Sequence, residues 1–120
     1  MTRVLVIGFD PATIPGYDPA PVLAALDRGR ARFTELGIDY EECLVPLDDR
    51  VEQRITEALT AAGYECVVVG GGLRKPEELL ELFERVVNLV RVHQPGAAIA
   101  FNSNPEDSAD AALRWLPQPS

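Results

Sequence analysis

Cysteine and histidine are too scarce in this chain for a disulfide scaffold or a common metal site. Its 120 residues include two cysteines and one histidine. Cys43 and Cys66 each lie inside an apolar stretch, and neither belongs to a C-x-x-C motif or a Cys/His cluster. We therefore expect reduced, buried thiols and no bound metal. A domain of this length buries roughly two-thirds of its unfolded surface, which is enough to fold without either kind of cross-link.

Long apolar runs and an excess of positive charge are also missing. No apolar run approaches the roughly 20 residues that a membrane span requires, and the first residues lead straight into a predicted strand instead of a signal peptide. We therefore expect a cytoplasmic protein. The chain carries 11 Lys and Arg against 19 Asp and Glu, a formal charge of −8. Because that field repels nucleic acid and anionic membranes, we predict neither as a partner, although a local basic pocket stays open.

Short apolar, β-branched segments alternate with amphipathic segments along the chain. The predicted strands cover residues 4–9, 40–45, 66–69 and 97–101. The predicted helices cover residues 19–36, 50–62, 76–93 and 105–116. This alternation favours one α/β domain over residues 1–120, with a four-stranded parallel sheet in the order 2-1-3-4 and helices on both faces. Such a topology is flavodoxin-like and Rossmann-like, short of a fifth strand.

Two segments have the residue spacing of helix caps. Asp49 and Glu52 stand in capping-box spacing at the start of the second predicted helix. Asn104 precedes Pro105, a residue that favours the first position of a helix. We therefore expect a capped start at both places.

The fourth predicted strand lies at an edge of this sheet. Residues 97–101 contain no charge or proline that would block pairing with another chain, and apolar edges of this kind tend to associate. The helix over residues 76–93 also carries an apolar stripe wider than one sheet face needs. We predict a homodimer through this strand, this helix or both.

Ligands of open α/β sheets bind beyond the carboxyl ends of the strands, at the point where the strand order reverses. Here that point lies between the first and third strands. Its walls are the loop over 8–18, which is long for a connection of this kind, the loop over 70–76 and the turn over 102–104. The predicted ligand-binding residues are Asp10, Gly70, Gly71, Gly72, Arg74, Asn102 and Ser103. Tyr17 and Trp115 could stack on a ligand ring, although an aromatic residue at the end of an amphipathic helix more often belongs to a core or an interface.

The segment from Gly70 to Lys75 carries three glycines and two cations ahead of a helix. Backbone N–H groups and the side chains of Arg74 and Lys75 converge there, which suits a phosphate or a carboxylate. The segment matches neither the P-loop nor the dinucleotide-binding pattern. Three glycines also suit a tight structural turn, so an anion site and a turn both stay open.

Two further residues have a structural and a functional interpretation. Asp10 ends the first strand, where many α/β enzymes keep an acid, a base or a metal ligand, but Asp-Pro also begins turns. Asn102 could reach into the crevice as a hydrogen-bonding side chain, whereas Asn104 is a helix cap. We assign no catalytic residue, because the single histidine and both cysteines fall away from the predicted crevice.

Several segments of the chain resemble a group of small bacterial proteins of uncharacterised function. They are GFDP over residues 8–11, VVVGGGLR over 67–74, AIAFN over 98–102 and PEDS over 105–108. The resemblance implies a Rossmann-like or flavodoxin-like fold, and it implies no particular activity, cofactor or catalytic residue.

Two classes of function therefore stay open. In the first, the crevice binds an anionic or nucleotide-like small molecule against Gly71, Gly72 and Arg74. In the second, the chain is a non-enzymatic interaction module that uses the helix over 76–93 and the strand over 97–101. We favour the first, because the long proline-rich loop after the first strand is hard to explain as a mere connection.

Overall fold

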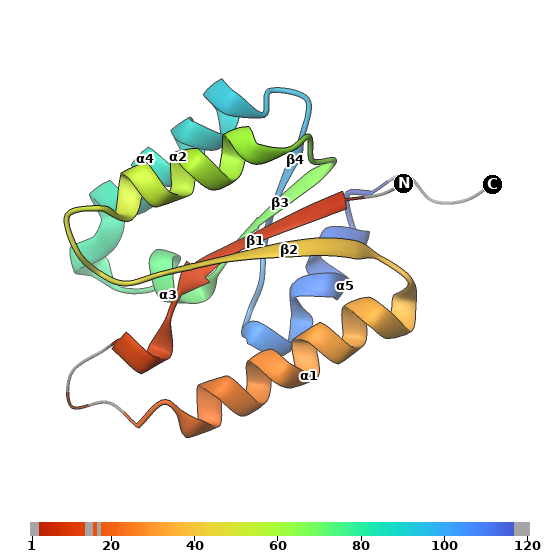
Figure 1. The fold of residues 1–120 in the computed structure, drawn as a ribbon, viewed down its shortest axis with the longest axis horizontal. Helices are drawn as coiled ribbons and strands as arrows, with labels where there is room; N and C mark the ends of the chain where they lie inside the picture. Colours follow the sequence, from red (N-terminus) through yellow and green to blue (C-terminus); the bar gives the residue numbers. More distant parts are fainter. Residues whose placement is uncertain (1–2, 14–15, 17, 117–120) are drawn as a thin grey trace.

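The computed structural model describes residues 3–13, 16 and 18–116 (Figure 1); Tyr17 lies outside the described residues. The strands are β1 (Arg3–Phe9), β2 (Asp39–Val45), β3 (Cys66–Val69) and β4 (Ala98–Phe101). The α-helices are α1 (Ala20–Leu36), α2 (Val51–Ala61), α3 (Gly71–Arg74), α4 (Leu80–His93) and α5 (Ser108–Leu113). Three 3-10 turns complete the order, η1 (Pro11–Thr13), η2 (Glu77–Leu79) and η3 (Pro105–Asp107). No helix in the described part of the chain is long and apolar enough to cross a membrane.

The four strands are all parallel and lie in the order β2-β1-β3-β4, which confirms the predicted α/β topology. β1 and β3 are direct neighbours, with Val6 beside Val68 and Ile7 beside Val69. The chain passes from β1 to β2 on one side and then crosses to β3 on the other side of β1. The strand order therefore reverses between β1 and β3, at the predicted position.

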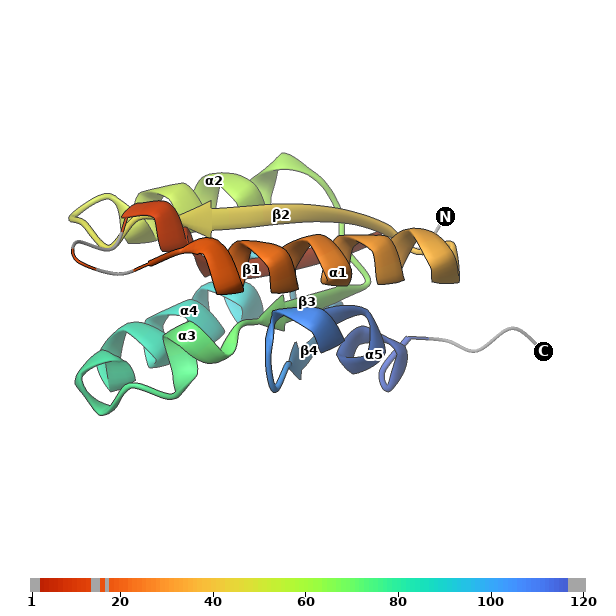
Figure 2. The same cartoon turned by 90° about the horizontal axis from the view of Figure 1, so that it is seen from below.

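Helices cover both faces of the sheet, α2 and α4 on one face and α1 and α5 on the other (Figure 1). Figure 2 looks onto the face that α1 and α5 cover. Side chains of β1 alternate between the two cores, Leu5 and Ile7 in one and Val4 and Val6 in the other. β3 is buried along its whole length, which explains its unbroken run of apolar residues.

α1 and η3 approach each other so closely that only glycine fits between them. A Cβ atom on Gly29 would lie 2.2 Å from the carbonyl oxygen of Pro105. Arg28 and Glu106 form an ion pair beside this contact. The contact holds the segment after β4 against α1, and so it helps to position the turn over residues 102–104.

The segment after β3 differs from the prediction of a loop and one helix that opens at Pro76. Residues 71–74 form the short helix α3, and the N–H of Lys75 donates to the carbonyl of Gly71 at 2.8 Å. Pro76 is extended, and the chain passes through η2 before α4 begins at Leu80. α3 ends there because proline has no N–H to continue the helical hydrogen bonds.

One of the two predicted helix caps is confirmed and the other is wrong. Asn104 and Asp107 form a capping box at the start of η3, in which the Asp107 carboxylate accepts the N–H of Asn104 at 3.2 Å. Asp49 forms no such box, because Arg50 flanks α2 and no side chain caps that helix. Asp48 instead accepts the N–H of Arg50 at 2.9 Å, and this turn sets the start of α2.

Candidate functional site

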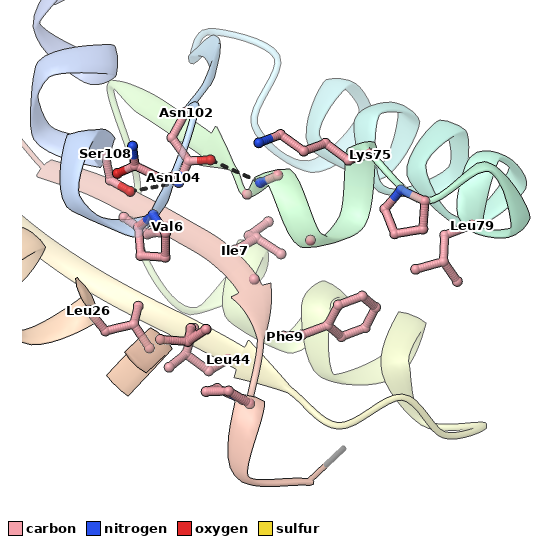
Figure 3. Close-up of a pocket in the computed structure, with 18 of the residues that line it drawn as sticks. Val6, Ile7, Phe9, Leu26, Leu44, Lys75, Leu79, Asn102, Asn104 and Ser108 are labelled. Carbon is pink, nitrogen blue, oxygen red and sulfur yellow. Dashed lines mark hydrogen bonds between the residues drawn. The ribbon is translucent and has the colours of Figure 1, made fainter. Parts of the chain in front are cut away.

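A crevice of about 620 Å³ opens at the carboxyl ends of β1 and β3, where the strand order reverses (Figure 3). Apolar side chains from α1, from β2 and from the segment after β2 line it, namely Val22, Leu26, Leu44 and Leu47. Phe9 and Leu79 lie on the side opposite Leu26 and Leu44, and Pro76 also lines the crevice. The polar side chains of the lining belong to Lys75, Glu78, Ser108 and residues 102–104.

Glycines line the crevice between these walls, at position 8 and at positions 70–72. The N–H of Gly70 donates to the carbonyl of Ile7 at 2.8 Å, and a Cβ atom on Gly70 would lie 3.1 Å from the same oxygen. The chain therefore crosses the end of β1 at a distance that leaves little room for any side chain at position 70. A Cβ atom on Gly72 would meet the Phe9 ring at 3.5 Å.

Asn102 joins the two turns that flank the crevice. Its side chain accepts the N–H of Gly71 at 2.9 Å and donates to Oγ of Ser108 at 2.9 Å (Figure 3). Asn102 and Ser108 are both buried, so these bonds replace lost contacts with water. Asn102 and Ser103 both line the crevice, with the side-chain amide of Asn102 engaged in the fold.

The two cations of the predicted anion site both bind the turn over residues 102–104, but only Lys75 is among the described lining residues. Lys75 lines the crevice, and its Nζ donates to the carbonyl of Ser103 at 2.7 Å. Arg74 is not among the lining residues. Its guanidinium donates to the carbonyl of Asn102 at 2.7 Å and lies 5.9 Å from the centre of the Phe101 ring. Within the described residues, Nε of Arg74 is buried without a hydrogen-bond acceptor. Of the described lining residues, Lys75 is the one that carries a positive charge.

Several backbone N–H groups of the glycine segment are used by the fold. The N–H of Gly70 binds β1, and that of Gly71 binds Asn102. The N–H of Leu73 donates to the carbonyl of Gly70 at 3.1 Å. These bonds are those of a tight turn, the structural interpretation of the three glycines.

Asp10 begins the turn that leaves β1. Its carboxylate accepts the N–H of Ala12 at 3.0 Å, and its carbonyl accepts the hydroxyl of Thr13 at 2.8 Å. Its own N–H donates to the carbonyl of Val45 at 2.9 Å. Asp10 does not line the crevice, whereas its neighbour Pro11 does. The Asp-Pro turn accounts for the position of this carboxylate.

The two cysteines, Cys43 and Cys66, and the single histidine, His93, do not line the crevice. Cys66 begins β3 and is fully buried, and burial raises the pKa of its thiol to about 11. Burial also raises the pKa of Cys43, so both thiols stay protonated at neutral pH. His93 ends α4, away from the carboxyl ends of the strands. In the part of the chain that the structure describes, no cluster of three or more His, Cys, Asp or Glu could hold a metal ion.

The sequence does not reveal the apolar walls of the crevice. Leu44 belongs to a strand and Leu79 to a helical stripe, so both look like ordinary core residues. The excess width of that stripe is the signal that could have indicated Leu79. Leu47 is 61% exposed in a short connection, and a leucine in such a segment is the other available signal.

Comparison with known proteins adds no relative. No protein-family model matches the sequence, and no curated protein matches it. The resemblance to small bacterial proteins therefore stays a prediction, and the interpretation of the crevice depends on its own geometry.

Proposed function

We propose that this protein binds a small molecule with an anionic or nucleotide-like polar end in the crevice beyond β1 and β3. The observation that carries the proposal is a crevice of about 620 Å³ that combines apolar walls with one ammonium group at a topological switch point. Ligand sites of open α/β sheets lie at such points, and ligand pockets commonly have volumes of roughly 300–1,000 Å³.

The walls and the polar groups have complementary tasks in this proposal. Leu26, Leu44 and Leu79 remove the body of the ligand from water, which supplies affinity. Lys75 supplies the positive charge for its anionic end. Arg74 acts indirectly, because its bond to the carbonyl of Asn102 holds the turn over 102–104 in place.

A thermal-shift screen with nucleotides, sugar phosphates and carboxylates tests the proposal, followed by calorimetric titration of each hit. We expect a hit to raise the Tm of the wild type and to bind Lys75→Gln more weakly. Arg91→Gln is the matched control, because it removes a positive charge from an exposed position of α4 outside the crevice. If no compound of the three classes stabilises the wild type, the proposal is wrong.

A second proposal concerns the outer edge of β4. The N–H of Ala98 donates to Glu65 on the β3 side at 2.9 Å. Successive residues of a parallel strand turn their backbone groups to opposite sides, so Ile99 turns its N–H and carbonyl outward. Phe101 is 38% exposed on the same strand. We propose that a second copy of the chain pairs with this edge to form a homodimer.

Light scattering coupled to size-exclusion chromatography tests this pairing at tens of micromolar. A dimeric mass is the expected result, and a monomeric mass rejects the pairing while leaving the crevice proposal intact. The cytoplasmic location and the bacterial origin stay predictions from the sequence.

A further inference from the structure

We infer that the ligand is an amphipathic monoanion, with one carboxylate or a similarly small, singly charged head beside Lys75 and an apolar body between the walls of the crevice. The inference rests on the proposed function and narrows it, because it excludes nucleoside diphosphates and triphosphates.

The charge of the lining argues against a multiply charged ligand. Of the described residues that line the crevice, Lys75 and Glu78 are the charged ones, and their formal charges cancel at neutral pH. Arg74 is not among the described lining residues, and its guanidinium donates to the carbonyl of Asn102. The whole chain carries a formal charge of −8, which repels multiply charged anions at long range. A polyphosphate would thus meet one ammonium, whereas such groups usually bind several donors, cations or a metal ion.

Lys75 is held in a position that suits one small anionic head. A Cβ atom on Gly71 would lie 3.2 Å from Cε of Lys75, so the lysine stem runs directly over this glycine. Its Nζ donates one hydrogen bond to the carbonyl of Ser103 at 2.7 Å, and an ammonium group has three N–H donors. The remaining donors can pair with carboxylate oxygens. Glu78 lines the same crevice and disfavours a second negative charge there.

The walls favour hydrocarbon over a sugar. Leu26 and Leu44 stand on one side of the crevice, and Phe9 and Leu79 stand on the other (Figure 3). Ribose hydroxyls placed against these side chains would lose hydrogen bonds to water without replacement. An alkyl or aryl body loses none, and its affinity rises with the apolar area that it buries.

Calorimetric titration of the full chain with hexanoate, octanoate and decanoate, each below its micelle concentration, tests the inference. We expect the affinity to rise roughly three- to fourfold with each buried methylene until the crevice is filled. The uncharged 1-octanol should bind about tenfold more weakly than octanoate, which corresponds to one lost charge-assisted hydrogen bond. AMP, ADP and ATP should all bind more weakly than octanoate.

Lys75→Met keeps an apolar stem over Gly71 and removes the charge. It should weaken octanoate binding about tenfold and leave 1-octanol binding unchanged, whereas the control Arg91→Gln changes neither. If Lys75→Met fails to fold, the ratio of octanoate to 1-octanol affinity in the wild type makes the same test.

Three results would overturn the inference. If ADP or ATP binds more tightly than octanoate, the inference is wrong and the proposed function stands. If carboxylate binding depends neither on chain length nor on the charge of Lys75, the inference is also wrong. If no probe of any class binds, the inference and the proposed function are both wrong.

Discussion

A side-chain amide connects separate segments at each end of the parallel sheet, Gln94 at the amino end and Asn102 at the carboxyl end, but a crevice lies beside Asn102. At the amino end, the amide of Gln94 donates to the carbonyls of Leu59 and Ala62 at 2.6 and 2.7 Å. It also accepts the N–H of Tyr64 at 3.1 Å. One side chain therefore satisfies three backbone groups where the end of α2 and the segments before β3 and after α4 meet.

At the carboxyl end, Asn102 also connects separate turns, but it leaves a crevice beside them. Its amide holds Gly71 and Ser108, and the glycines at 70–72 supply no side chains to fill the space in front of it. An amide bridge therefore decides only which segments are held together. Whether a site forms beside the bridge depends on the size of the neighbouring residues.

The largest effect is expected at the close contact that anchors the carboxyl end. Gly29→Ala places a Cβ atom 2.2 Å from the carbonyl oxygen of Pro105, so α1 and η3 must separate, and the free energy of unfolding should fall by about 3 kcal/mol. Gly63→Ala is the control from the amino end, because a Cβ atom there meets nothing within 4 Å. Urea denaturation measures both, and equal losses in the two variants would contradict the prediction.

The second prediction distinguishes the role of Gln94 from that of Asn102. Gln94→Ala leaves three backbone groups without their partner, so the free energy of unfolding should fall by roughly 2 to 3 kcal/mol. Ligand affinity should stay at the wild-type value, because Gln94 does not line the crevice. Asn102→Ala should lose both stability and affinity. Urea denaturation measures stability, and calorimetry with the best ligand of the screen measures affinity. A loss of affinity in Gln94→Ala would show that the crevice depends on both amide bridges.

The same difference between the ends explains what the sequence could predict. The strand order and the placing of Gly70, Asn102 and Ser103 at the switch point follow from alternation alone, because β-branched runs and helical stripes are strong local signals. The sequence does not predict which of the two cations, Arg74 or Lys75, lines the crevice. That placement depends on the helical turn of α3, and glycines at its start disfavour a helix. That turn brings Lys75 over Gly71, four residues earlier, whereas Arg74 is not among the described lining residues.

The helix caps show a second limit of local patterns. Asp49 and Asn104 each stand three residues before an acidic residue, yet only Asn104 makes a capping box. The competing turn at Asp48 uses the nearby N–H of Arg50. The spacing of two residues therefore indicates a possible capping box, and competing hydrogen bonds nearby decide whether it forms.

The third prediction concerns the buried thiol of Cys66, at the amino end of β3. Burial raises the pKa of Cys66 from the ordinary 9.0 to about 11, so the folded chain binds this proton more tightly than the unfolded chain. The resulting stability is complete below pH 9 and is lost as the pH rises through 11. Between these values the wild type should lose about 2 kcal/mol more than Cys66→Ala, measured by urea denaturation at each pH. Parallel curves for the two proteins would show that the thiol does not titrate in this way.

The smallest effect is expected for the ion pair beside the contact of Gly29 with Pro105. Arg28 and Glu106 join α1 to η3 through exposed side chains, so Glu106→Gln should change the free energy of unfolding by less than about 0.5 kcal/mol, and less still in high salt. The N–H of Glu106 keeps its bond to Asn104 in this variant. Both variants alter the contact between α1 and η3: Gly29→Ala changes its shape, and Glu106→Gln changes its charge. Because Gly29 lies so close to Pro105, we expect the shape of this contact to matter more than its charge. Similar losses in the free energy of unfolding for the two variants, measured by urea denaturation, would show that charge matters as much.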